Sequence, residues 1–153
     1  MGEALKRRLK QRKFENPLHV SVLNLMVAAD YVRSHMERHC NRFGITHSQY
    51  NVLRILRGIH PNGHPRGEIA SRMIERAPDV TRLIDRLEKQ GLVERDRSAS
   101  DRRLSMTRIT KKGLDLLDRM KPDEEFRHFS ERIRLRDRKI LSRICETIYS
   151  DET

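Results

Sequence analysis

The chain has 153 residues, with 33 Lys or Arg against 22 Asp or Glu and a formal net charge of +11. This length suits one domain, or one and a half, with a real hydrophobic core. The basic excess favours a polyanionic partner such as nucleic acid, although a solvated basic surface is the plainer alternative. Because no apolar run reaches a membrane span and no signal peptide follows the basic N-terminus, we expect a cytoplasmic protein without membrane contact.

The chain begins with a basic arm, residues 1–17, in which six of eight consecutive residues are Lys or Arg. Three interpretations stay open: a disordered arm that touches phosphates, a solvated tail, or a short helix anchored by Leu5, Leu9 and Phe14. The apolar residues that follow recur at helical spacing and predict a long helix from residue 18 to about residue 42.

Thr46 and Gln49 are spaced as a capping box, which predicts the start of the next helix. That helix ends at residues 60–65, where two prolines and an Asn-Gly pair indicate a loop. A short helix follows, with Ile69 and Ile74 among its inward-facing residues. A tight connection then leads into the next helix, on which the functional interpretation depends.

That helix is predicted from Pro78 to Gln90. Its apolar residues fall at i, i+3, i+4 and i+7, the period of one buried face: Val80, Leu83, Ile84 and Leu87. Pro78 suits the first helical turn, and Gly91 suits the left-handed position after the last turn. Two short helices joined by a tight turn, the second with an exposed polar face, are typical of a helix-turn-helix. We therefore expect this helix to read DNA.

A β-hairpin is predicted next, from strands at residues 92–95 and 104–109 joined by an arginine-rich turn. Thr110 can cap the following helix, and Pro122 must kink that helix, end it or begin a new one. A last helix is predicted over about residues 134–149. The fold class is therefore mainly α with a small β-hairpin (α+β).

The order of these elements resembles the MarR family of transcriptional regulators. Three runs carry the resemblance, among them the family's wing signature of an Asp and an Arg two residues apart: Val80–Arg95, Asp101–Arg103 and Ile109–Gly113. The close match covers about residues 45–120. It implies a winged helix-turn-helix at 45–113 and a helical dimerisation region at 18–44 and 114–153. The chain departs from the family pattern in its short C-terminal region and in Thr107, where an aliphatic residue is usual.

The DNA contacts follow from side-chain chemistry and from the resemblance. Arg82 and Arg86 could reach guanine or phosphate, and Thr81 could contact a phosphate or a thymine methyl. In the family, the wing-tip arginine enters the minor groove while an aspartate holds its guanidinium; here these are Arg103 and Asp101. The complete set of expected contacts is Pro78, Asp79, Thr81, Arg82, Arg86, Arg95, Arg97, Asp101, Arg102 and Arg103.

Two of these arginines have a second interpretation. Arg86 could instead pair with Asp85 or Glu88 on a solvated helix face. Arg95, at the end of the first hairpin strand, is expected to be either a salt-bridge residue or a phosphate contact.

One such domain covers a single half-site, so recognition of a palindrome requires a homodimer. The family builds the dimer from its first helix and its last two. The corresponding apolar residues here are Leu18, Val22, Leu25, Ile140, Leu141, Ile144, Ile148 and Tyr149. Because repression is the commoner mode in the family, we expect a repressor that binds a palindromic operator.

Many relatives bind small phenolic or lipophilic effectors in a cleft between the dimer helices and the winged helix. By position, the residues that could line this cleft are His35, Met36, His39, Tyr50 and Arg54, although core packing and solvent exposure would explain them equally well. The spacing of His35 and His39 also suits zinc, and Cys40 could act as a redox switch. Zinc-sensing and peroxide-sensing relatives place those residues elsewhere, so we expect no metal or other cofactor and a buried structural thiol at Cys40.

Two other function classes remain as alternatives. An architectural DNA-binding protein would bind random and palindromic DNA equally, with a steep salt dependence. An enzyme would need a catalytic constellation, and the sequence contains neither a Ser-His-Asp arrangement nor a phosphate loop. We therefore expect no catalytic activity.

Overall fold

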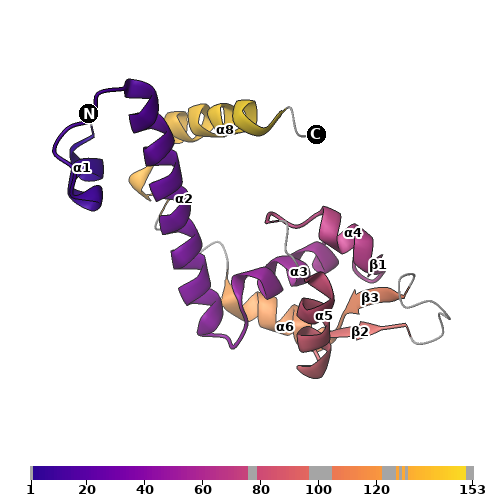
Figure 1. Ribbon diagram of the computed structural model, residues 1–153. Coiled ribbons are helices and arrows are strands. Elements are labelled where there is room, and N and C mark those ends of the chain that lie inside the picture. Colours follow the sequence, from indigo (N-terminus) through magenta and orange to yellow (C-terminus); the bar gives the residue numbers. More distant parts are fainter. Residues whose placement is uncertain are drawn as a thin grey trace.

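A lobe of short helices and a small sheet lies at one end of a long helix in the computed structural model (Figure 1). The structure describes residues 2–75, 79–96, 105–121, 127, 129 and 131–150. Its elements in chain order are α1 (Glu3–Leu9), α2 (Pro17–Asn41), α3 (His47–Arg57), β1 (His64–Pro65), α4 (Arg66–Ser71), α5 (Val80–Lys89), β2 (Val93–Arg95), β3 (Met106–Ile109), α6 (Lys111–Met120) and α8 (Leu135–Tyr149). The lobe contains α3 to α6 and the strands, whereas α1 and α8 lie at the other end of α2.

Side-chain caps define where α3 and α6 begin. The capping box of α3 is confirmed: the Gln49 amide donates to Thr46 Oγ1 (3.2 Å), and the Thr46 amide donates to Gln49 Oε1 (2.9 Å). Thr110 caps α6, since its hydroxyl oxygen accepts from the Gly113 amide (3.2 Å). These polar side chains satisfy amides that have no partner inside the helix.

The start of α5 differs from the sequence prediction. The helix begins at Val80, and Asp79 is its N-cap, accepting a hydrogen bond from the Arg82 amide (3.0 Å). The expectation that Pro78 lies in the first turn was therefore wrong, because the Asp79 carboxylate provides the stronger start signal. Pro78 itself lies outside the described residues. The predicted end is confirmed, with Gly91 in the left-handed region at φ 70°.

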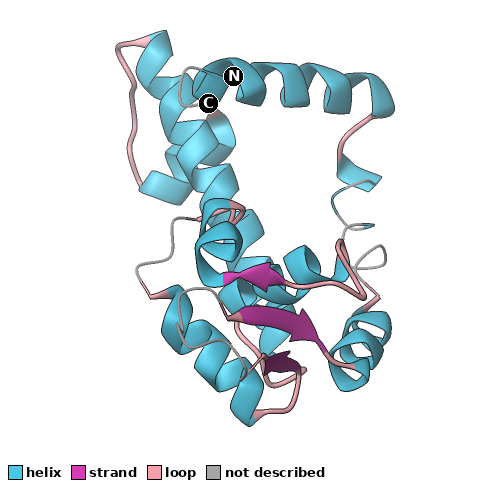
Figure 2. Ribbon diagram, turned by 90° about the vertical axis from the view of Figure 1, so that its right-hand side faces the viewer, coloured by secondary structure: helices cyan, strands magenta, loops and turns pink. Residues whose placement is uncertain are grey.

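The sheet has three antiparallel strands in the order β1-β3-β2, one more than the predicted hairpin (Figure 2). Val93 pairs with Ile109, and His64 pairs with Thr107. We predicted residues 60–65 as a loop, and the strand β1 corrects that prediction. Two residues are too few to show a strand period, and the turn residues around them dominate the local sequence signal.

The core of the lobe is made of apolar side chains from α3, α4, α5, β2, β3 and α6 and from the end of α2. Its most completely buried members include Leu53, Leu56, Ile69, Ile84, Leu87 and Leu117. α6 packs inside this core through Leu116, Leu117 and Met120, although the sequence boundary at residue 114 assigned it to the dimerisation region. Cys40 is completely buried, as expected for a structural thiol.

The basic arm is partly helical. Leu5 is buried, whereas Leu9 is exposed and Phe14 is half-buried, so one of the three expected anchors holds α1 in place. None of the described helices is long and apolar enough to cross a membrane.

Candidate nucleic-acid interface

The face of α5 opposite the core presents cationic side chains to solvent. Val80, Ile84 and Leu87 anchor the helix in the core. Arg82 and Arg86 are exposed on the other side, together with Lys89. The Arg86 side chain makes no ion pair or hydrogen bond with any residue that the structure describes, so the alternative pairing with Asp85 or Glu88 is not seen.

Arg82 forms an exposed ion pair with the N-cap residue of α5. Its Nε lies 2.9 Å from Asp79 Oδ2, and its side chain is 79% exposed. An exposed pair of this kind contributes about 0–1 kcal/mol, so a stronger acceptor can displace Asp79 at little cost. The guanidinium is therefore positioned near the N-terminal end of α5 but remains available.

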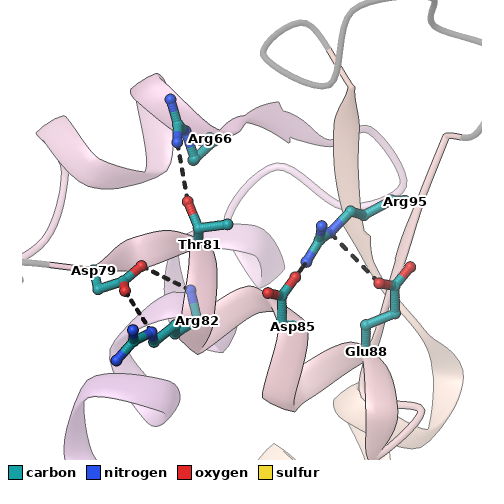
Figure 3. A network of polar contacts seen from close by, with 7 residues as sticks. All are labelled: Arg66, Asp79, Thr81, Arg82, Asp85, Glu88 and Arg95. Atoms are coloured by element: carbon teal, nitrogen blue, oxygen red, sulfur yellow. Dashed lines mark hydrogen bonds and ion pairs between the residues drawn. The ribbon is translucent and has the colours of Figure 1, made fainter.

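Arg95 connects the sheet to α5, as Figure 3 shows. It extends from β2 and donates through Nη2 to Asp85, while its Nε lies 3.6 Å from Glu88 Oε2. The Nε atom is buried and makes no hydrogen bond to any described residue, and the side chain is only 24% exposed. Of the two interpretations offered by the sequence, the salt bridge is the one observed. Arg95 thus fixes the first wing strand relative to the helix.

Replacing Arg95 by alanine is expected to weaken DNA binding about 10-fold, because helix and wing lose their shared contact and two carboxylates are left without a cation. The logarithmic slope of affinity against salt concentration should stay unchanged, since no phosphate contact is lost. A fluorescence anisotropy titration at several salt concentrations measures both. A slope lowered by about one unit would instead make Arg95 a phosphate contact.

Arg66 is a residue of this interface that the sequence did not reveal. It lies in the first turn of α4, and its Nη1 donates to Thr81 Oγ1 on α5 (2.9 Å; Figure 3). This bond joins the two helices of the helix-turn-helix. Arg66 and Thr81 also line a cavity of about 290 Å³ between α5 and the sheet, together with Asp85, Arg95 and Thr107. No local pattern marks Arg66, because its role depends on a partner fifteen residues away.

The base of the wing is well defined. The Asp96 amide donates to the Met106 carbonyl (2.9 Å), and Ser105 Oγ donates to the Asp96 carbonyl (2.7 Å). These bonds continue the pairing of β2 with β3 beyond Arg95. The expected wing contacts Arg97, Asp101, Arg102 and Arg103 lie outside the described residues.

Comparison with known proteins identifies the family to which the chain is similar. Residues 45–105 match the sequence profile of the MarR family. A MarR transcription factor from Planctomyces limnophilus, known from a crystal structure, is 32% identical, covers 88% of this chain and 99% of its own, and superposes with a TM-score of 0.64. The chain belongs to the MarR family.

Other MarR relatives are similar over shorter stretches or in fold alone. The HTH-type transcriptional regulator MhqR from Bacillus subtilis is 30% identical over 92 residues, which are 60% of this chain and 62% of MhqR. The match to PapX from Escherichia coli is 33% identical and covers 51% of this chain and 48% of PapX. Sco3205 from Streptomyces coelicolor, solved in complex with DNA, shares the fold with a TM-score of 0.78 at 23% identity, covering 92% of this chain and 94% of its own.

The residues expected to form a MarR dimer interface are all exposed in the single chain. They lie on α2 and α8, and α8 has no buried residue among those described. Ile144 is 51% exposed and Leu18 is 67% exposed. These two helices therefore offer apolar faces that nothing in the single chain covers.

The expected effector residues do not share one pocket among those described. Met36 and Tyr50 belong to the core, and His35 contacts the ring of Phe129. His39 lines a pocket of about 390 Å³, whereas Arg54 lines a separate one of about 380 Å³.

His39 lies near the end of α2 and is buried against α6. Its Nε2 lies 3.0 Å from the Met120 carbonyl, and its Nδ1 lies 2.7 Å from Arg42 Nη2. Because a guanidinium only donates, Nδ1 must accept and Nε2 must carry the hydrogen. The Nε2 contact joins the end of α2 to α6, and the Nδ1 contact with Arg42 lies within the end of α2. Among the described residues, no group of three His, Cys, Asp or Glu side chains is arranged for a metal ion.

Proposed function

We propose that this chain is a repressor that binds a palindromic operator as a homodimer. The observation that carries the proposal is the exposed arginine face of α5, joined to the first wing strand by Arg95. MepR from Staphylococcus aureus has been solved with DNA, as has Sco3205, and both have this fold. Operator binding would place the protein in the cytoplasm, where bacterial and archaeal DNA lies.

α5 has the dimensions and chemistry for the major groove. Arg82 and Arg86 lie one helical turn apart on the exposed face, so both can point into the same groove. A guanine presents O6 and N7 acceptors to such a guanidinium, and a phosphate offers the alternative contact. Asp79 and Thr81 stand at the N-terminal end of the helix, which usually enters the groove first.

The wing adds a minor-groove contact to this proposal. A narrow A·T-rich minor groove concentrates negative potential and favours an inserted arginine, the role proposed for Arg103 with Asp101 as its support. Arg103→Ala is expected to weaken operator binding about 10-fold or more while the dimer stays folded. A gel-shift titration measures the change, and an unchanged affinity would remove the wing from the mechanism.

A dimer is needed because one α5 helix covers one half-site. The exposed apolar residues of α2 and α8 are the proposed interface. Ile144→Asp places a charge in the middle of the α8 face, which should shift the chain from dimer to monomer at micromolar concentration. Sedimentation analysis measures this shift. A wild-type monomer, or a dimer indifferent to the substitution, would contradict the proposed interface.

A small phenolic or lipophilic effector is the proposed signal for release from DNA. CouR from Rhodococcus jostii, which has this fold, has been solved with p-coumaroyl-CoA. The pockets lined by His39 and by Arg54 have volumes in the range of small-molecule sites. We propose that one of them, completed by the partner subunit, receives the effector.

Selection of bound duplexes from a random library tests the function itself. We expect a palindrome whose half-sites are centred about 10 base pairs, or a multiple of that distance, apart. Recovery of unrelated sequences with equal affinity and a steep salt dependence would instead indicate an architectural DNA-binding protein.

A further inference from the structure

The basic segment before α2 forms a second cationic surface, separate from the one on α5. Residues 1–13 hold six basic side chains and one acidic side chain, a net charge of +5 out of +11 for the whole chain. Six of the eight residues from 6 to 13 are Lys or Arg, and none of them is among the proposed operator contacts. Its position in the fold therefore needs a separate explanation.

The first part of the segment forms α1, which packs against α2, and Lys10, Arg12 and Lys13 follow in the connection between the two helices. Leu5 is 2% exposed, and the Lys10 amide closes α1 by donating to the Lys6 carbonyl. Arg8 Nη2 lies 3.8 Å from Asp30 Oδ2 on α2. Most basic side chains of the segment are exposed to solvent.

Most of the charge on this surface is left without a counter-charge. Lys6 donates to Glu3 (2.8 Å), and this hydrogen bond lowers the pKa of the Glu3 carboxyl. The remaining cations are exposed and form no ion pair with any described residue: Arg7, Lys10, Arg12 and Lys13. Unpaired cations spaced closely along one surface are the groups that release counterions when they meet a nucleic-acid backbone.

This surface lies beside the first half of α2, with Arg8 reaching Asp30 near the middle of that helix, whereas α5 lies in the lobe beyond the last turn of α2. Figures 1 and 2 both show the lobe with α5 and the strands at one end of α2, and the start of the chain at the other. α2 has 25 residues, so its axis is about 37 Å long. The basic surface and the exposed face of α5 are therefore two separate surfaces of the chain.

We propose that the surface formed by Arg7, Lys10, Arg12 and Lys13 binds the phosphate backbone of a second DNA duplex, so that one dimer bridges two DNA segments. The contact is independent of sequence, because side chains that reach phosphates carry no base information. Bridging of two duplexes rests on the proposed operator binding by α5. Phosphate binding by the basic surface is independent of that proposal.

The test compares two triple variants of the full chain that lose the same charge. Arg7→Gln/Lys10→Gln/Arg12→Gln removes it from the basic surface and keeps Leu5. Arg38→Gln/Arg57→Gln/Arg119→Gln, the control, removes it from exposed positions on α2, α3 and α6. Circular dichroism verifies that both variants are folded.

Each protein is loaded on an immobilised short duplex that contains only the selected operator, and the capture of a labelled 30-base-pair duplex of unrelated sequence is measured. The wild type and the control should capture it equally. The basic-surface variant should capture at least about 10-fold less at 0.1 M salt, because several phosphate contacts are lost. Its affinity for the short operator should stay within about twofold of the wild type.

Three results would overturn the bridge. The wild type could capture no second duplex, or the basic-surface variant could capture as much as the wild type. The variant could also lose operator affinity as strongly as it loses capture, which would place the basic surface on the operator duplex itself. If no protein binds the operator in the loading step, the proposed function has failed, and capture of the labelled duplex by directly immobilised protein still tests the basic surface.

Discussion

Replacing Arg82 and Arg86 together by alanine is expected to weaken operator binding at least about 100-fold. The dimer presents these side chains twice, once in each half-site, and each well-formed arginine contact with a guanine contributes about 1–3 kcal/mol. Both guanidinium groups are exposed on α5 and neither supports the core, so the folded state should be unaffected. A fluorescence anisotropy titration at constant salt measures the loss.

The control for this experiment is Arg57→Ala/Arg119→Ala, which removes the same charge from exposed positions on α3 and α6. It should change operator affinity only through the general electrostatic attraction, by a few-fold at most. If both double variants lose affinity equally, α5 contributes only charge and does not read bases. An unchanged affinity of the α5 variant would place the DNA elsewhere on the protein.

Gly113→Ala is expected to reduce the free energy of unfolding by about 3 kcal/mol. A Cβ atom at this position would lie 2.7 Å from Ile109 Cγ1 and closer still to the Leu92 carbonyl oxygen. The Leu92 carbonyl directly precedes β2 and accepts a hydrogen bond from the Thr110 amide, so it cannot move aside easily and the start of α6 must shift away from the β2–β3 hairpin. Urea unfolding followed by circular dichroism measures the change.

Gly67→Ala is the matched control for that substitution. Gly67 lies in α4, and a Cβ atom there would have no neighbour within 4 Å. The added methyl reduces the freedom of the unfolded chain, so this variant should be slightly more stable than the wild type, by about 0.4–1 kcal/mol. A Gly113→Ala protein as stable as Gly67→Ala would contradict the close packing of α6 on the sheet.

The sequence predicted most reliably what depends on neighbouring residues. Thr46 with Gln49 and Thr110 with Gly113 lie three residues apart, so their caps can be recognised without knowledge of the fold. The apolar period of α5 likewise requires only its own residues. The start of α5 was predicted too early, because Pro78 and Asp79 are adjacent and both are residues that favour a helix start.

Features that depend on distant residues were missed or left open. β1 forms because His64 pairs with Thr107, 43 residues further along the chain. Arg66 acquires its role by reaching Thr81, and Arg95 by reaching Asp85 on the preceding helix. For Arg95, a carboxylate and a phosphate were both chemically reasonable partners, and only the folding of β2 against α5 distinguishes them. The dimer faces remain predictions, because a single chain cannot show what covers them.

Dimethyl sulfate protection on the selected operator tests the reading of DNA most directly, because the reagent methylates guanine N7 in the major groove and adenine N3 in the minor groove. We expect two clusters of protected guanine N7 atoms, centred about 10 base pairs apart, with protected adenine N3 atoms beside each cluster. The guanine protection should disappear in the Arg82→Ala/Arg86→Ala protein at concentrations that still saturate the DNA. Saturated operator with every guanine N7 still reactive would contradict major-groove reading by α5.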